Sequence, residues 1–86
     1  MKLSTKGRYG LRVMYYLAEA PDRVITLSEL SYKSKVSGPY LEKILGYLKK
    51  AELVTTERGA NGGYVISRNP KEISIGEVLR SLEDNL

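Results

Sequence analysis

Residues 26–50 read TLSELSYKSKVSGPYLEKILGYLKK, and the fold prediction rests mainly on them. It opens with a capping box, in which the backbone amide of Glu29 can donate to the Thr26 hydroxyl while the Glu29 carboxylate reaches back. Such a pair marks the start of a helix. The sequence therefore predicts a short helix that runs to about Ser34 and ends in a tight turn at Lys35 and Val36.

A longer helix is predicted after this turn. Ser37 is placed to cap it, and Pro39 falls in the first turn, where a missing N–H does no harm. Four residues follow the spacing of a single apolar helical face, which we expect in the core: Leu41, Ile44, Leu45 and Leu48. The residues expected on the outward face are Tyr40, Glu42, Lys43, Tyr47, Lys49 and Lys50. The helix is expected to end near Ala51.

Two extended segments follow, and we expect them to pair as a β-hairpin. Residues 53–57 and 64–68 are rich in β-branched side chains, and the intervening RGANGG is a turn sequence. A short helix, a tight turn, a longer helix and then a hairpin is the order of a winged helix-turn-helix. The fold predicted for residues 1–86, taken as one domain, is therefore mainly α with a small β-hairpin.

The flanking segments fit this order. A first helix is predicted from Ser4 or Thr5 to just before Pro21, with a short strand at residues 24–25. Its predicted core face consists of Leu11, Met14, Tyr15 and Ala18. A second capping box, from Ser74 to Glu77, predicts a last helix whose apolar face holds Ile75, Val78, Leu79 and Leu82.

The composition excludes several classes of protein chemistry. The 86 residues contain no Cys and no His, so disulfides, thiolate or imidazole metal sites and Ser-His or Cys-His catalysis are excluded within them. The acidic residues form no evident catalytic pair. We therefore expect no cofactor, no metal and no enzymatic activity.

The charge is basic and unevenly distributed. Lys and Arg number 14 against 10 Asp and Glu, for a net charge of +4. The excess lies in residues 1–18 and 33–50, while residues 69–86 are acidic. Such clusters favour nucleic acid or an anionic membrane surface, although a solvated charged face remains an alternative. No apolar run approaches the roughly 20 residues that span a bilayer, and the N-terminus lacks a signal-peptide core, so we expect a cytoplasmic protein.

Three segments offer candidate nucleic-acid contacts. Recognition helices use their first turns, which here hold Ser37, Tyr40, Glu42 and Lys43. A carboxylate such as that of Glu42 can accept from a cytosine amine, or it can simply pair with a nearby Lys. The Gly-rich turn places Arg58 to enter a minor groove, with an ordinary hairpin as the alternative. The acid-free N-terminal run, with Ser4, Lys6 and Tyr9, suits phosphate contacts or a solvated helix start.

Several stretches together resemble the Rrf-two family of bacterial winged-helix regulators. The opening MKLSTKGRYGLR (1–12) resembles the family's start, and YLEKIL (40–45) its recognition helix. LKKAELV (48–54) and RGANGGY (58–64) resemble the end of that helix and the wing. ISIGEVL (73–79) resembles the helix that follows. The resemblance runs in order along essentially the whole chain.

The resemblance implies a sequence-specific DNA-binding regulator, usually a repressor, that acts as a homodimer on a palindromic operator in double-stranded DNA. By position, Ser4, Lys6 and Tyr9 would hold the phosphate backbone, and Ser37, Tyr40, Glu42 and Lys43 would face the major groove. The wing would reach the minor groove through Arg58, Gly59, Asn61, Gly62, Gly63 and Tyr64.

The chain also departs from the family pattern. Many members carry three Cys that bind an iron–sulfur cluster, and this chain has none. Members usually continue into a long dimerisation helix beyond the last of these motifs, so the resemblance covers the DNA-binding part. Glu52 stands where the family often has Gly. A winged-helix module that binds a protein partner instead of DNA remains the alternative, although the basic clusters argue against it.

Overall fold

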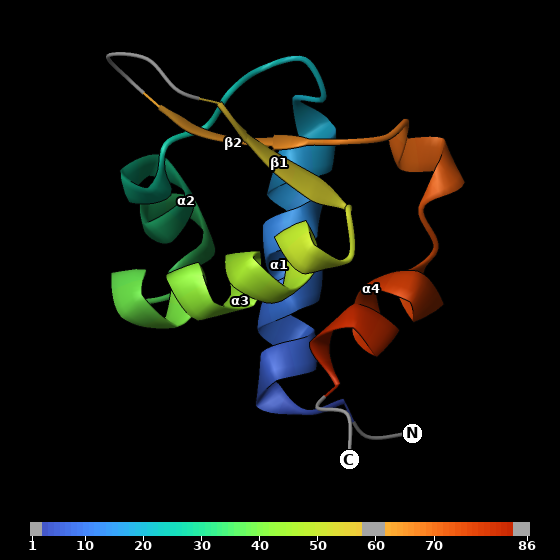
Figure 1. Cartoon of the computed structure of the whole chain (residues 1–86). Helices are drawn as coiled ribbons and strands as arrows, with labels where there is room; N and C mark the ends of the chain where they lie inside the picture. The colour runs from blue at the N-terminus through green and yellow to red at the C-terminus, as the bar shows by residue number, and fades with distance from the viewer. Residues whose placement is uncertain (1–2, 58–61, 84–86) are drawn as a thin grey trace.

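The computed structural model describes residues 3–57 and 62–83, and it shows the expected order of elements (Figure 1). The elements are α1 (Thr5–Glu19), α2 (Leu27–Ser34), α3 (Gly38–Lys50), β1 (Val54–Glu57), β2 (Gly63–Ile66), the 3-10 turn η1 (Pro70–Glu72) and α4 (Ile75–Leu82). The prediction of a mainly α fold with a small hairpin, a winged helix-turn-helix, is confirmed. Within this described part, no helix combines the length and apolar character needed to cross a membrane.

Side chains placed just before the helices fix where three of them begin. The hydroxyls of Ser4, Thr26 and Ser74 accept from the amides three residues later, at 2.9, 3.1 and 3.0 Å. Both predicted capping boxes therefore place their Ser or Thr as expected. Ser37 precedes α3 in the same extended conformation but makes no side-chain cap bond. The start of α3 is therefore held by contacts other than a side-chain cap.

The hairpin is joined to the segment before α2. β1 and β2 pair antiparallel, with Val54 opposite Ile66. Tyr64 also exchanges two backbone hydrogen bonds of 2.8 Å with Ile25, which is the short strand predicted at residues 24–25. A Cβ on Gly63 would overlap the Ile25 carbonyl, so a glycine is required where the two backbones meet.

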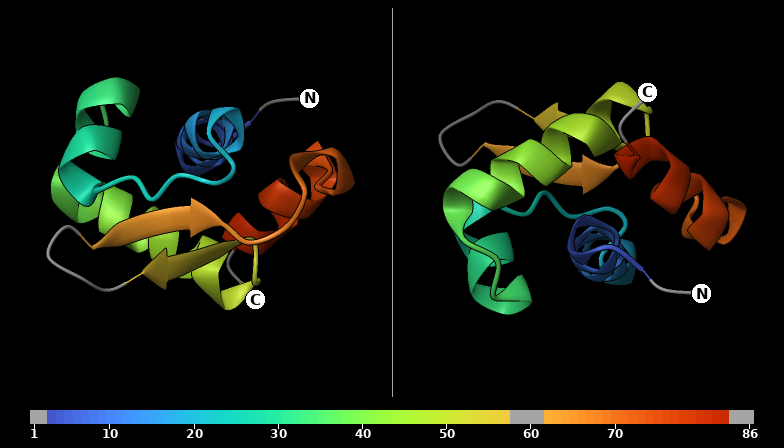
Figure 2. Two further views of the ribbon diagram at one scale, coloured as in Figure 1. Left: turned by 90° about the horizontal axis from the view of Figure 1, so that it is seen from above. Right: turned by 90° about the horizontal axis from the view of Figure 1, so that it is seen from below.

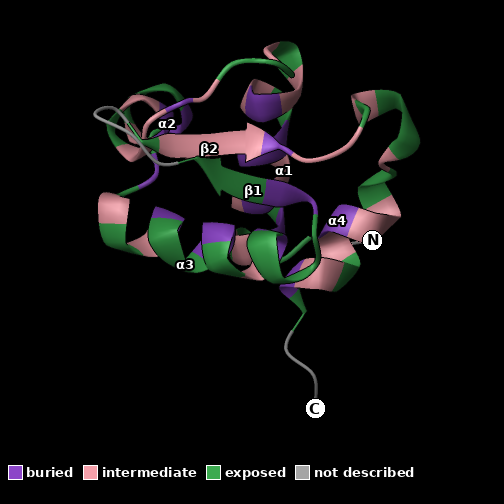
Figure 3. Ribbon diagram, turned by 45° about the horizontal axis from the view of Figure 1, so that its top comes forward, coloured by how far each residue is buried: buried purple, intermediate pink, exposed green. Residues whose placement is uncertain are grey.

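α1 packs against α2, α3, β2 and α4. Figure 2 shows it close to end-on, between α2 and α4, with the hairpin on one side of it. The predicted core face of α3, namely Leu41, Ile44, Leu45 and Leu48, is buried as expected. Figure 3 shows the burial of α3 confined to its inner side, while its outer side is exposed. This one-sided packing leaves an outer face of α3 available to a partner.

The predicted core faces of α1 and α4 are wrong in part. The buried residues of α1 are Gly7, Gly10, Val13, Met14 and Leu17, so Met14 alone is shared with the prediction. Tyr15 and Ile75 are 58% and 66% exposed and line an apolar groove of about 330 Å³ between α1 and the α4 region. The reason is that α4 packs Leu79 and Leu82 against Gly7 and Gly10, which turns a glycine face of α1 inward.

Candidate nucleic-acid interface

The exposed side of α3 forms one continuous strip along the helix. Six residues at helical spacing are exposed, and we call them the α3 outer strip: Pro39, Glu42, Lys43, Gly46, Lys49 and Lys50. Three Lys against a single Glu give this strip a positive charge. A basic, one-sided helix behind a helix-turn-helix turn is the arrangement that enters a DNA major groove.

Glu42 is the acidic residue of this strip. In the sequence it had two interpretations, a pairing with a nearby Lys or a contact to a base. The ion pairs found in residues 3–57 and 62–83 join Arg23 and Lys33 to Glu29 and Arg68 to Glu77, and none includes Glu42. The exposed carboxylate is therefore able to accept a hydrogen bond from a ligand.

Gly46 lies in the middle of the strip, one turn beyond Glu42. A Cβ at this position would have no atom within 4 Å, so nothing in the described structure requires a glycine. Glycine inside a helix destabilises it by roughly 0.5–1 kcal/mol relative to alanine. Its use here leaves the α3 backbone open to close approach from outside. Sequence reasoning missed this residue, although a lone glycine within a regular helical pattern was the available signal.

Tyr40 and Tyr47 differ from the expectation that they face outward. Both are half-buried, because α1 runs alongside α3 and packs against their rings. The Tyr9 ring meets the Tyr40 ring edge to face at 5.8 Å, and Lys6 Nζ lies 4.5 Å from the centre of the Tyr47 ring. The structure thus brings the predicted residues Lys6, Tyr9 and Tyr40 together on one flank of α3.

Two predicted serines lie at helix starts. Ser4 is exposed, and its hydroxyl oxygen accepts from the Gly7 amide, which leaves the hydroxyl hydrogen free to donate. Ser37 is exposed and has no cap bond. Gly38 and Tyr40 supply backbone amides in the first turn of α3, whereas Pro39 has no N–H, and Ser37 adds a hydroxyl without a cap bond. Helix N-termini favour phosphate through these amides and the helix dipole.

The predicted wing residues fall into two groups. Arg58, Gly59 and Asn61 lie outside the described residues. Gly62 is exposed, whereas Gly63 and Tyr64 belong to β2, are half-buried and form the contact with Ile25. Figures 1 and 2 show the end of β1 at Glu57 and the start of β2 at Gly63 on the same side of the molecule as α2 and the start of α3. The predicted wing contacts therefore start on the side where α3 begins.

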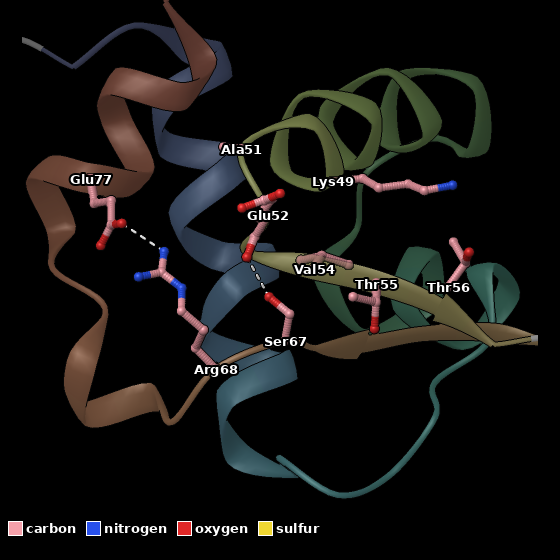
Figure 4. A pocket seen from close by; sticks show the side chains of 9 residues that line it. All are labelled: Lys49, Ala51, Glu52, Val54, Thr55, Thr56, Ser67, Arg68 and Glu77. Atoms are coloured by element: carbon pink, nitrogen blue, oxygen red, sulfur yellow. Dashed lines mark hydrogen bonds and ion pairs between the residues drawn. The ribbon is translucent and has the colours of Figure 1, made fainter.

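A polar pocket lies at the other end of α3, against the base of the hairpin (Figure 4). Arg68 Nη2 bonds the Glu77 carboxylate at 2.6 Å, and the Ser67 hydroxyl donates to the Glu52 carbonyl. The hydrogen bond from Arg68 is the main reason that the pKa of Glu77 lies below its ordinary value. These bonds tie the residues that follow β2 to α4 and to Glu52, just beyond α3, so they hold the base of the hairpin against the C-terminal end of α3.

Sequence comparisons identify related regulators. Residues 3–86 match the family described as "Rrf2: Iron-dependent Transcriptional regulator". The chain is 43% identical over 84 residues to the HTH-type transcriptional regulator CymR of Bacillus subtilis, covering 96% of this chain and 61% of CymR. It is 38% identical over 87 residues to the putative HTH-type transcriptional regulator slr0846 of Synechocystis, covering 100% of this chain and 59% of that relative. The chain thus spans about 60% of the length of these relatives.

The family description names iron, which proteins bind through a limited set of side chains. Iron sites of regulators are built from Cys, His and carboxylate ligands, and these 86 residues contain neither Cys nor His. The part of the chain that the structure describes also brings together no group of three or more acidic residues. The residues present do not fit an iron site, so no step of the function is assigned to iron here.

A solved structure supports the same relationship. IscR of T. potens superposes with a TM-score of 0.91 at 40% sequence identity, covering 100% of this chain and 64% of that one. Its match extends over the helices and the hairpin described above. With a family match over nearly the whole chain and this structural agreement, the chain belongs to the Rrf2 family of transcriptional regulators.

Proposed function

We propose that residues 1–86 are a DNA-binding domain that recognises a specific operator, with the α3 outer strip in the major groove. The observation that carries this proposal is Glu42, an exposed carboxylate without an ion-pair partner in the described residues, set among lysines. The lysines attract the phosphates, and the carboxylate selects a base by accepting from a cytosine amine. Ser37, Tyr40 and Lys43 complete the set at the first turns of α3.

Contacts to the DNA backbone are proposed on both flanks of α3. Ser4, Lys6 and Tyr9 would contact phosphates from the α1 side, since α1 packs along α3. The minor groove would be reached from the hairpin by Arg58, Gly59, Asn61, Gly62, Gly63 and Tyr64. For Arg58, Gly59 and Asn61 this assignment rests on the sequence. For Gly63 and Tyr64, which pair with or lie against the Ile25 backbone, it means that they hold in place the part of β2 next to the turn.

The whole regulator is proposed to act as a cytoplasmic homodimer that represses transcription from a palindromic operator. One copy presents a single α3, and a helix-turn-helix protein reads a symmetric site with two copies spaced by about one DNA turn. The relatives named as HTH-type transcriptional regulators, CymR among them, support a regulatory role.

A genomic-fragment selection with the purified protein tests this function. The expected result is enrichment of one motif, arranged as an inverted repeat. Its binding constant should fall by about 0.9 log units per phosphate contact for each tenfold increase in salt concentration. A matched selection with the Lys71→Ala variant, a lysine of the 3-10 turn away from α3, should recover the same motif. If the wild-type protein enriches no motif, or captures a stoichiometric protein partner and no DNA, the proposal is wrong.

A further inference from the structure

Arg12 links α1 to the turn of the helix-turn-helix. Its Nη1 donates to the backbone carbonyl of Ser34 at 2.8 Å. Ser34 is the last residue of α2, and its carbonyl is one of those that the helix leaves without an internal partner. The guanidinium therefore satisfies the C-terminal end of α2 and complements the negative end of its dipole.

Arg12 also supports the start of α3 through Tyr9. The guanidinium lies 5.0 Å from the centre of the Tyr9 ring, and that ring packs edge to face against Tyr40 at 5.8 Å. Tyr40 belongs to the first turn of α3. One side chain of α1 thus contacts the residue before the turn directly and the residue after it through a single ring.

The turn itself is fixed mainly from the α2 side. The Ser31 hydroxyl donates to the Val36 carbonyl at 2.6 Å, and the buried Ser34 hydroxyl accepts from the Val36 amide at 3.3 Å. On the α3 side, Ser37 forms no cap bond. The direction in which α3 leaves the turn therefore depends on its packing against α1, α2, α4 and β1. The Arg12–Tyr9–Tyr40 chain is the contact from α1 that reaches both the end of α2 and the first turn of α3.

We propose that Arg12 is a positioning residue that sets the orientation of α3, and that it is not one of the cations that bind DNA by charge. This inference rests on the proposed function, in which α3 reads the DNA. A planar guanidinium can bond a carbonyl at its edge while its face lies over a ring. A lysine at this position would keep the charge and lose that combination, so Arg12→Lys separates the two roles.

The control is Arg8, which lies one turn earlier on α1. It carries the same charge and is exposed, and within residues 3–57 and 62–83 its guanidinium hydrogen-bonds only the Thr5 hydroxyl of its own helix, at 3.4 Å. Arg8→Lys therefore preserves charge without disturbing a link to the turn. Each variant is measured against the selected operator and against an unrelated duplex of equal length across a salt series. Amide hydrogen exchange of residues 35–41 is measured without DNA.

Arg12→Lys is expected to weaken operator binding about tenfold, the scale of one charge-assisted hydrogen bond, and to leave the unrelated duplex and the salt slope unchanged. Exchange should accelerate at residues 35–41 and nowhere else, and Arg8→Lys should change nothing. Unchanged operator affinity and exchange in Arg12→Lys would overturn the proposal, as would faster exchange throughout the chain. If the wild-type protein binds no operator, the proposed function is wrong. The positioning role of Arg12 is then still tested, because the exchange measurement is made without DNA.

Discussion

The rings of Tyr9 and Tyr40 meet edge to face, with their centroids 5.8 Å apart and their planes at 81°. Tyr9 comes from α1 and Tyr40 from the first turn of α3, so this contact joins the helix proposed to hold phosphates to the helix proposed to read bases. Each residue thus has two separable parts. The ring packs the two helices together, and the hydroxyl is the group proposed to contact DNA.

Substitution of Tyr9 separates these parts. Tyr9→Phe keeps the ring, so the free energy of unfolding should change by less than about 0.5 kcal/mol, while operator binding weakens through loss of the hydroxyl. Tyr9→Leu removes the ring contact and should lower the free energy of unfolding by a further ~0.5–1.5 kcal/mol. Urea denaturation and a binding titration check both values. Equal stability of the Phe and Leu variants would contradict a ring contact that stabilises the fold.

Gly46→Ala should raise stability and lower DNA affinity together. The new Cβ meets no atom within 4 Å, so the helix gains about 0.5–1 kcal/mol from the better propensity of alanine. The same methyl group projects from the α3 outer strip and should obstruct close approach to the groove. Thermal melting and a titration with the selected operator measure the two effects. A stabilised variant with unchanged affinity would show that the α3 backbone does not approach DNA here.

Gly10→Ala provides the contrasting case on α1. A Cβ there would overlap the side chain of Leu82, which is 2% exposed and has little room to move. Overpacking of this kind typically destabilises a core by about 1–3 kcal/mol, more than the gain in helix propensity. The two glycine variants should therefore shift the melting temperature in opposite directions.

Glu52→Gly should stabilise the protein by about 0.5–1 kcal/mol. Glu52 has φ 63°, which is strained for any residue with a side chain. Its amide bonds the Lys49 carbonyl, and the Leu53 amide bonds the Leu48 carbonyl, which is the hydrogen-bond pattern of a helix end that favours glycine. Ala51→Gly, one residue earlier at φ −83°, should instead destabilise. Denaturant titrations compare the pair, and a lower stability of Glu52→Gly would contradict this account.

Glu77 should make stability depend on pH in the acid range. The hydrogen bond from Arg68 holds the pKa of Glu77 below its ordinary value of 4.5 in the folded protein. A lowered folded pKa means that this contribution is present above the unfolded pKa and is lost as pH falls through the folded pKa. The melting temperature of Glu77→Gln should thus lie below that of the wild type near neutral pH and approach it as pH falls through the lowered pKa of Glu77. A difference in melting temperature between the two proteins that stays constant with pH would contradict a stabilising Arg68–Glu77 ion pair.

The sequence predicted the element order and the core of α3, because capping residues, turn residues and a one-sided apolar pattern agree there. The core face of α1 could not be predicted in the same way. Residues 11–18 of α1 contain one charged side chain, that of Arg12, so periodicity does not select one face there. Glycines are not recognised as core residues until α4 is known to pack on them.

The sequence also predicted part of the candidate site, namely the exposed residues of α3, but not the contacts that α1 makes with it. Glu42 and Lys43 lie on the outer strip as expected, because local helical spacing alone determines their direction. Tyr40 and Tyr47 lie on the border of that strip, and only the position of α1 shows that they pack inward. Arg12 was likewise undetectable as a link to the turn, since its partner Ser34 lies 22 residues away in sequence.

The role of α3 in reading bases is tested most directly by the base preference of Glu42→Gln. The amide keeps the size of the side chain but replaces one acceptor oxygen with a donor, so a contact to a cytosine amine is weakened selectively. Relative affinities are measured for every single-base change of the selected operator, for wild type and variant. The account predicts that Glu42→Gln loses about 1–3 kcal/mol of discrimination at one base pair in each half-site, with the other positions unchanged. A uniform change of affinity across all positions, or an unaltered preference, would contradict it.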